Sequence, residues 1–130
     1  MIEFALLIPL LVLIVFGAID LARAYHAQVT LTNASREGAR LAMRINTLFD
    51  TDANKLQAIR QRVVDEAGAS GINIIPGDVT VTCLASGVYV TPCASGTAIR
   101  IRAEYDFYLL MGAYFIPSIT LSHSTEMVAP

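Results

Sequence analysis

The hydrophobic pattern begins with an uncharged run near the start of the chain. It covers sixteen residues, Phe4 to Ile19 (FALLIPLLVLIVFGAI), with Glu3 before it and Asp20 after it. As an α-helix this run would be about 24 Å long, slightly shorter than the roughly 30 Å hydrocarbon core of a bilayer. Pro9 removes one backbone hydrogen bond and predicts a local kink, while Gly17 gives a neighbouring helix room to approach.

Three interpretations of this run compete. A cleaved signal peptide is disfavoured, because the chain begins with the acidic sequence MIE and no A-x-A pattern follows. A permanent single-span anchor is allowed by length. A stem that lies in the membrane before assembly and in a helix bundle afterwards accounts for both the length and Glu3, and we therefore favour it.

The helical pattern continues well beyond Asp20. No proline occurs between residues 10 and 50, so one helix is predicted over residues 1–47, about 65 Å long. A small domain cannot cover that length, so lipid or other chains must bury part of it. Small and apolar residues form one stripe at spacings of three and four: Gly17, Leu21, Ala24, Gln28, Leu31, Ser35, Gly38, Ala42 and Ile45.

The rest of the chain, residues 48–130, is predicted to form a globular head. A second helix is expected over residues 52–68, with Thr51 or Asp52 as its N-cap and Gly68 or Gly71 as its stop. The loop 46–51 is the expected hinge. β-rich segments follow at Ile72–Ile75, Val79–Cys83, Val88–Val90, Ile99–Phe107 and Ile119–Val128. The predicted class is α+β, with an antiparallel sheet that has one face against the helices.

The composition of the chain limits the classes of function that it can have. The chain has 130 residues, 55% hydrophobic and 15% charged, with mean hydropathy +0.56 and net charge −2. One compact domain plus a long helix fits this length, and no basic field argues for nucleic acid. His26 and His123 are isolated in the sequence, and no metal, nucleophile or phosphate-binding motif surrounds them. We therefore expect no catalysis, no metal and no cofactor.

Cys83 and Cys93 bracket a segment rich in Gly, Ser, Thr and Pro. They can form a disulfide in an oxidising compartment, contributing roughly 3 kcal/mol by the loop-entropy model, or remain two free thiols. The bridge is favoured because the chain is expected to be exported, and because further metal ligands are absent nearby in the sequence.

The stretch EFALLIPLLVLIVFGAID, followed by NASREGARLA at residues 33–42, resembles the TadE-like tight-adherence pilins and pseudopilins, relatives of type IV pilins. The β-rich end ITLSHSTEMV is similar in character. The resemblance implies removal of a leader by a prepilin peptidase, insertion in the inner membrane, and assembly by pilus machinery into an extracellular homopolymer. Glu3 matches the family's acidic residue near the processed N-terminus. That residue usually lies at the fifth mature position, whereas here only Met1 and Ile2 precede it.

Glu3 is the residue that most needs a partner, because a carboxylate beside an apolar segment is costly in a bilayer or bundle core. It can pair with an α-amino terminus, its own or a neighbour's, or lie among headgroups and stabilise the helix N-terminus. Together with Phe4, Pro9 and Gly17 it forms the predicted assembly site.

Further along the helix, Arg36, Glu37 and Arg40 form either a solvated face or a polar contact between subunits. Asp20 and Arg23, three residues apart, are expected only to mark the water boundary. The aromatic-rich end is expected to be domain core or subunit contact; its members are Tyr105, Phe107, Tyr108, Tyr114 and Phe115.

These observations predict a structural subunit of a Tad-type filament with a role in adhesion or surface attachment. One alternative is a minor pseudopilin that initiates or caps a filament made of another subunit. Another is a single-span membrane protein with a small external binding domain.

Overall fold

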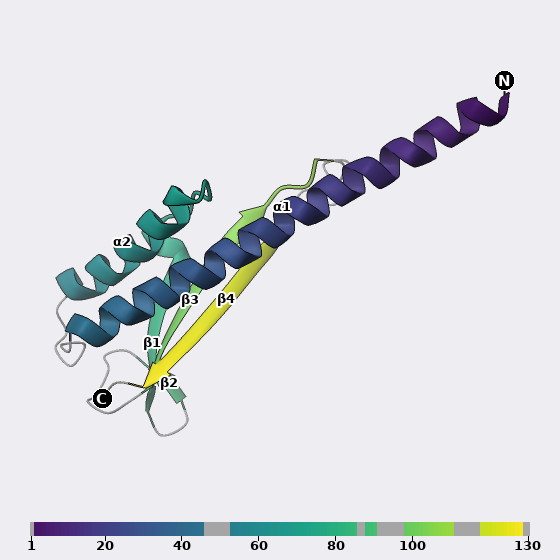
Figure 1. The fold of residues 1–130 in the computed structure, drawn as a ribbon. Helices are drawn as coiled ribbons and strands as arrows, with labels where there is room; N and C mark the ends of the chain where they lie inside the picture. Colours follow the sequence, from purple (N-terminus) through teal and green to yellow (C-terminus); the bar gives the residue numbers. More distant parts are fainter. Residues whose placement is uncertain (1, 46–52, 86–87, 91–97, 111–117, 129–130) are drawn as a thin grey trace.

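The computed structural model describes residues 2–45, 53–85, 88–90, 98–110 and 118–128, without the side chains of residues 2, 3, 5, 6, 85 and 88–90. In these ranges the elements follow one another as α1, α2, the short 3₁₀-helix η1, and strands β1 to β4 (Figure 1). The predicted α+β class is confirmed. The expected hinge at 46–51 and the expected N-cap lie outside the described residues.

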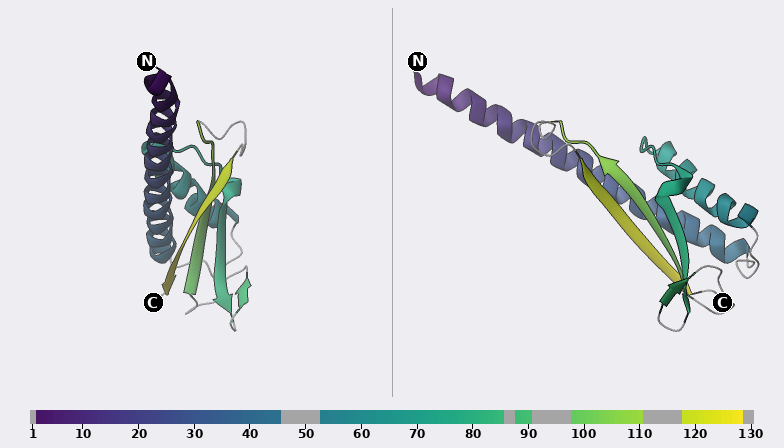
Figure 2. Two further views of the ribbon diagram at one scale, coloured as in Figure 1. Left: turned by 90° about the vertical axis from the view of Figure 1, so that its right-hand side faces the viewer. Right: turned by 180° about the vertical axis from the view of Figure 1, so that it is seen from behind.

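Helix α1 (Ile2–Ile45) is the long helix that the sequence predicts. Pro9 lies inside it, and the helix continues through this residue without interruption, so any local loosening there does not end it. The N-terminal half projects from the molecule, whereas the C-terminal half lies along the sheet and beside α2 (Figures 1 and 2). One continuous helix therefore belongs to both the projecting stem and the packed head.

Helix α2 (Ala53–Ala69) buries one face, formed by Ile59, Val63 and Ala67. Its end is fixed by a Schellman motif: the Ile72 N–H donates to the Ala67 carbonyl at 3.0 Å, and the Gly71 N–H donates to the Gly68 carbonyl at 3.0 Å. Gly71 has φ +80°, a conformation that glycine adopts without steric cost. The predicted stop at Gly71 is therefore confirmed.

The strand predicted at Ile72–Ile75 is wrong, because these residues form an extended connection without strand assignment and lead into η1 (Pro76–Asp78). The alternation that suggested a strand is real, since Ile72 and Ile74 are buried. The segment nevertheless lies between two turns. The Schellman motif precedes it, and Pro76 starts η1 after it, where the Asp78 carboxylate accepts the Ile75 N–H at 3.0 Å.

The sheet has the order β2-β1-β3-β4 in the described part of the chain, and every neighbouring pair is antiparallel. β3 and β4 pair along their whole length, from Ala98 opposite Val128 to Phe107 opposite Ile119. The four predicted strands are confirmed with slightly longer bounds for two of them. These bounds are β1 Val79–Ala85, β2 Val88–Val90, β3 Ala98–Phe107 and β4 Ile119–Val128.

The two faces of the sheet differ sharply, as strand alternation requires. Buried side chains pair across β1 and β3, with Val81 opposite Ile101 and Cys83 opposite Ile99. The opposite face carries ion pairs such as Arg100 with Glu126 of β4. The helices therefore cover one face only (Figure 2).

The core takes in the C-terminal half of α1 as well as residues of the head. Residues on both sides of the boundary predicted at residue 47 therefore pack together in one core. The buried apolar residues are Ala27, Leu31, Ala34, Ala39, Ala42, Ile59, Val63, Ala67, Ile72, Ile74, Val79, Val81, Cys83, Ile99, Ile101, Ala103 and Phe107.

Cys83 is completely buried in β1, and no free cysteine occurs among the described residues. Cys93 lies outside them, so the Cys83–Cys93 disulfide stays a prediction. We expect the intact mass of the exported protein to be about 2 Da lower without reductant than after reduction, because the bridge removes two thiol hydrogens. Identical masses under the two conditions would refute the bridge.

Candidate assembly surface

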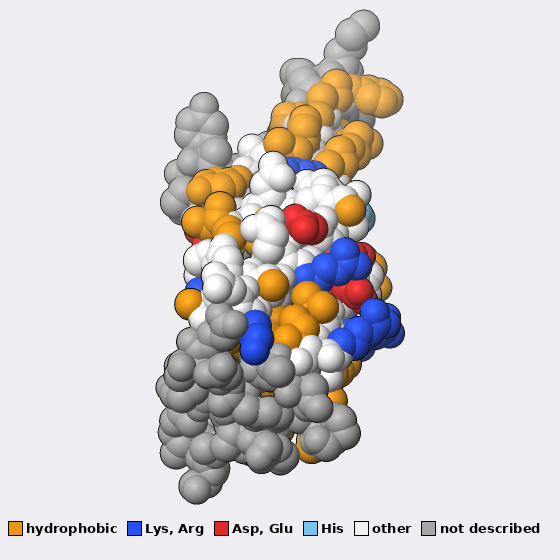
Figure 3. Space-filling model, turned by 90° about the vertical axis from the view of Figure 1, so that its left-hand side faces the viewer, with side chains coloured by type: hydrophobic (Ala, Val, Ile, Leu, Met, Phe, Trp, Pro, Cys, Tyr) orange, Lys and Arg blue, Asp and Glu red, His pale blue; other side chains and the backbone are white. Residues whose placement is uncertain are grey.

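The projecting part of α1 is an extended apolar surface. Among its side chains, Phe4 is 72% exposed and Leu11 63% exposed, although both would be buried in an ordinary soluble domain. Hydrophobic side chains gather on this projection, while charged side chains lie over the head (Figure 3). Exposed apolar surface of this extent marks a site for lipid or for other chains. We call residues 4–19 the stem.

By length and composition, α1 from Leu7 to Ile45 qualifies as a helix that can cross a membrane. Its most apolar 18-residue stretch has mean hydropathy 2.2 and is only 6% buried. A core helix of a soluble protein would have that stretch covered by its own domain. In the described part of the chain, this stretch of α1 is left largely uncovered.

The predicted assembly residues all lie on this projection, within the first five turns of α1. Phe4 and Pro9 are exposed, and a Cβ added at Gly17 would meet no atom within 4 Å. Among the residues that the structure describes, Gly17 therefore has no packing partner. Glu3 lies in α1, but its side chain is outside the described part of the structure, so its pairing stays a prediction.

Asp20 does more than mark the water boundary, which corrects the sequence interpretation. It is only 5% exposed, and its two carboxylate oxygens accept the Leu110 N–H at 3.1 and 3.0 Å. The predicted pair with Arg23 is present at 3.1 Å, and the Arg23 guanidinium lies 5.2 Å from the centre of the Phe107 ring. Asp20 thus ties the end of β3 to α1 at the base of the stem.

The polar segment of α1 makes a contact within the chain. Glu37 accepts a hydrogen bond from Arg62 of α2 at 3.0 Å and also pairs with Arg40 at 3.6 Å. The Arg62 hydrogen bond lowers the pKa of the Glu37 carboxyl below its usual value, so the pair stays charged to a lower pH than an isolated glutamate would. Arg36 is exposed and remains available for a contact between subunits, as does the outer side of Arg40.

Gly38 lies where α1 and α2 approach most tightly, because a Cβ added there would be 2.4 Å from Cγ2 of Val63 and 3.4 Å from Cδ1 of Ile101. The sequence placed Gly38 in the small-residue stripe but did not identify its neighbour. Three residues earlier in the same helix, Ser35 is completely buried and shares a 2.8 Å hydrogen bond with the Thr125 hydroxyl of β4. Sequence spacing gave no signal for that contact.

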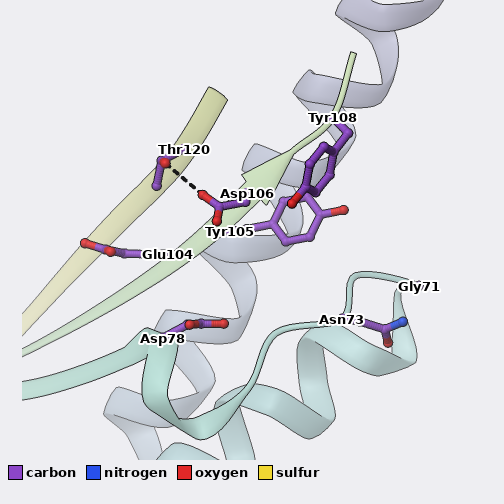
Figure 4. A pocket seen from close by; sticks show the side chains of 8 residues that line it. All are labelled: Gly71, Asn73, Asp78, Glu104, Tyr105, Asp106, Tyr108 and Thr120. Atoms are coloured by element: carbon purple, nitrogen blue, oxygen red, sulfur yellow. Dashed lines mark hydrogen bonds between the residues drawn. The ribbon is translucent and has the colours of Figure 1, made fainter. Parts of the chain in front are cut away.

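A polar cavity of about 390 Å³ lies beside the ends of β3 and β4 (Figure 4). Its carboxylates already have partners: Asp106 accepts from the Thr120 hydroxyl at 2.7 Å, Asp78 accepts from a backbone N–H, and Glu104 pairs with Arg102 at 2.8 Å. No group of three metal-binding side chains occurs among the residues described here. In this cavity each of the three carboxylates therefore has a hydrogen-bond or ion-pair partner.

The aromatic end of β3 divides between core and surface. Phe107 is 4% exposed and belongs to the core. Tyr105 is partly buried and packs against this core, and both residues therefore lie where a domain-core role predicts. Tyr108, in contrast, is 64% exposed. Tyr114 and Phe115 lie outside the described residues.

Comparison with known proteins supports the N-terminal resemblance. Residues 1–40 match the TadE-like protein family, and this match covers the stem and all of α1 except its last five residues. The TadE-like recognition made from the sequence is thereby confirmed over this segment. Searches of curated proteins and of solved structures returned no match. The family match suggests an association with the Tad pilus machinery, and the apolar helix suggests membrane association.

Proposed function

We propose that this chain is a structural subunit of a Tad-type filament and polymerises through its stem. One observation carries the proposal: along the uncharged run of residues 4–19, every side chain that the structure describes is exposed, on a helix whose second half is buried in the head core. At roughly 25 cal/mol per Å², covering this surface with stems of other copies offsets the entropy lost on ordering the polymer. The role is mechanical and needs neither catalysis nor a cofactor.

The remaining parts of the proposal rest on the TadE-like match at residues 1–40. The chain lies in the inner membrane before assembly, is processed by a prepilin peptidase, and is passed by the pilus machinery into a filament at the cell surface. Adhesion or surface attachment is the purpose that such a filament serves. The Cys83–Cys93 bridge fits this oxidising destination.

Two rival functions make different predictions. A minor pseudopilin that initiates or caps a filament would be a trace component of purified fibres. A single-span membrane protein with an external binding domain would stay in the membrane fraction and show no processed N-terminus. Mass spectrometry of shed surface fibres separates the three: this chain as the main component, with a processed first residue, is the expected result.

Removal of the acidic group at the start of the stem tests the assembly step directly. We expect Glu3→Ala to insert into membranes normally but to give markedly fewer filaments, because the carboxylate is expected to pair with an α-amino group in a low-dielectric bundle. The measurement is the ratio of sheared surface fibres to membrane-bound subunit. Asp65→Ala, which removes an exposed carboxylate from α2, is the matched control and should assemble normally. Wild-type fibre yield from Glu3→Ala would count against the pairing.

A further inference from the structure

The apolar surface of the molecule does not end with the stem at Ile19. Four large side chains continue it around the base of α1. Leu21 and Tyr25 of α1 are each 72% exposed, and Tyr108 and Leu110, just after β3, are 64% and 55% exposed. We call these four residues the collar.

The depth of the collar is set by Asp20. Because both Asp20 oxygens accept the Leu110 N–H, Leu110 lies level with residue 20 of the helix. Tyr25 lies five residues later, about 7.5 Å further along the axis. The collar therefore occupies the layer that directly follows the stem.

An exposed carboxylate at Asp20 would keep this layer out of the hydrocarbon core, because a charge inside a bilayer is costly. In the structure it is almost fully buried, bonded to a backbone N–H and paired with Arg23. The first charge after the stem is thus withdrawn from the surface. At this level the surface shows the collar together with the exposed side chains of Arg23 and His26.

The stem alone is about 24 Å long, some 6 Å less than the hydrocarbon core of a bilayer. The collar, with two leucines and two tyrosines, has the residue types that can extend the apolar layer over the missing length. Leucine extends the apolar layer, and tyrosine is enriched at the level of the headgroups, where its ring is apolar and its hydroxyl meets water. Arg23, with its side chain 45% exposed beside the collar, can extend its charge to the same level.

The arrangement of the collar favours lipid over a second copy of the chain. At 100° per residue, Leu21 and Tyr25 lie about 100° and 140° around α1 from Asp20, the residue that holds Leu110. Measured from Asp20 to Tyr25, the collar thus spans about 140° of the helix circumference. A fluid lipid layer can contact all of it.

We propose that the collar of Leu21, Tyr25, Tyr108 and Leu110 seats the base of the head in the bilayer interface before assembly, so that the membrane-embedded surface of the subunit comes from the head as well as from the stem. This inference rests on the membrane stage of the proposed function. It adds a lipid-contacting role for residues 108 and 110, which lie about ninety positions from the stem in the sequence.

The chain contains no tryptophan, so a single introduced tryptophan reports its own depth. The test places Tyr108→Trp in the full-length chain, reconstitutes it at low density in phosphatidylcholine vesicles, and measures quenching by lipids brominated near the headgroup or deep in the acyl chain. Leu11→Trp reports the middle of the stem. Val128→Trp, 69% exposed at the far end of β4, is the control in water.

We expect Tyr108→Trp to be quenched several-fold more than Val128→Trp, and more by the shallow than by the deep bromines, with Leu11→Trp showing the reverse depth preference. Leu110→Trp repeats the test should Tyr108→Trp fail to fold by circular dichroism. If Leu11→Trp is quenched while both collar reporters behave like Val128→Trp, the collar inference is overturned and the proposed function stands. If Leu11→Trp is itself unquenched, the membrane stage of the proposed function fails as well.

Discussion

Replacing Gly38 with alanine is expected to lower the free energy of unfolding of the head by about 1–2 kcal/mol, although alanine is the better helix former. The new Cβ would lie 2.4 Å from Cγ2 of Val63, a branched side chain that is completely buried and has little room to move. For a domain of this size, each kcal/mol lost from the free energy of unfolding lowers the midpoint temperature of thermal unfolding by about 3–6 °C. Thermal unfolding of the full chain in mild detergent measures the effect.

Two variants make the origin of that loss clear. Gly17→Ala introduces the same methyl group into the same helix where it meets no atom, so the head should unfold at the wild-type temperature or slightly above it. Val63→Ala removes the atom that Gly38→Ala would strike. The effects of Gly38→Ala and Val63→Ala on the free energy of unfolding should therefore be clearly non-additive. Val63→Ala should cost less stability in the Gly38→Ala background than in the wild type. Additive effects would show that the helix contact at Gly38 is looser than described.

An arginine in the middle of the stem is expected to prevent most of the protein from entering the membrane. Leu11 is 63% exposed near the centre of the uncharged run, and arginine at the centre of a membrane helix costs about 2.5–3.5 kcal/mol by insertion measurements. This corresponds to a loss of about 100-fold in the insertion equilibrium. The measurement is the fraction of Leu11→Arg protein that resists alkaline extraction of membranes.

Gln57→Arg is the matched control, because it adds the same charge to an exposed position of α2. It should remain in the membrane fraction like the wild type. Should Leu11→Arg resist extraction equally well, the stem would not be the segment that holds the protein in the bilayer. The folded head should be unaffected in both variants, which near-ultraviolet circular dichroism of the tyrosines can verify.

Features that depend on local periodicity could be predicted from the sequence. The apolar run, the stripe along α1 and the glycine stop of α2 each follow from a few neighbouring residues, and the structure has all three. The alternation at Ile72–Ile75 misled the same reasoning. Two buried isoleucines alternate there as in a strand, but turns on both sides leave the segment without room to extend into the sheet.

Features that depend on distant residues could not be predicted. The sequence shows Asp20 only as a charge after an apolar run, and its bond to the Leu110 N–H joins residues 90 positions apart. The tight approach at Gly38 likewise depends on where α2 packs. A buried carboxylate and a helix glycine are ambiguous until the tertiary partners are placed, because several different packings would satisfy either one.

The continuity of α1 also determines how a filament of this subunit would bear tension. A pull on the stem acts along the axis of a helix whose second half packs at an angle across β3 and β4 and contributes residues from Ala27 to Ala42 to the core. Such a load shears the whole contact at once and cannot peel it open one residue at a time. Rupture strength would then scale with the packed length of the helix, and the chain needs no flexible linker between the part that is pulled and the part that holds.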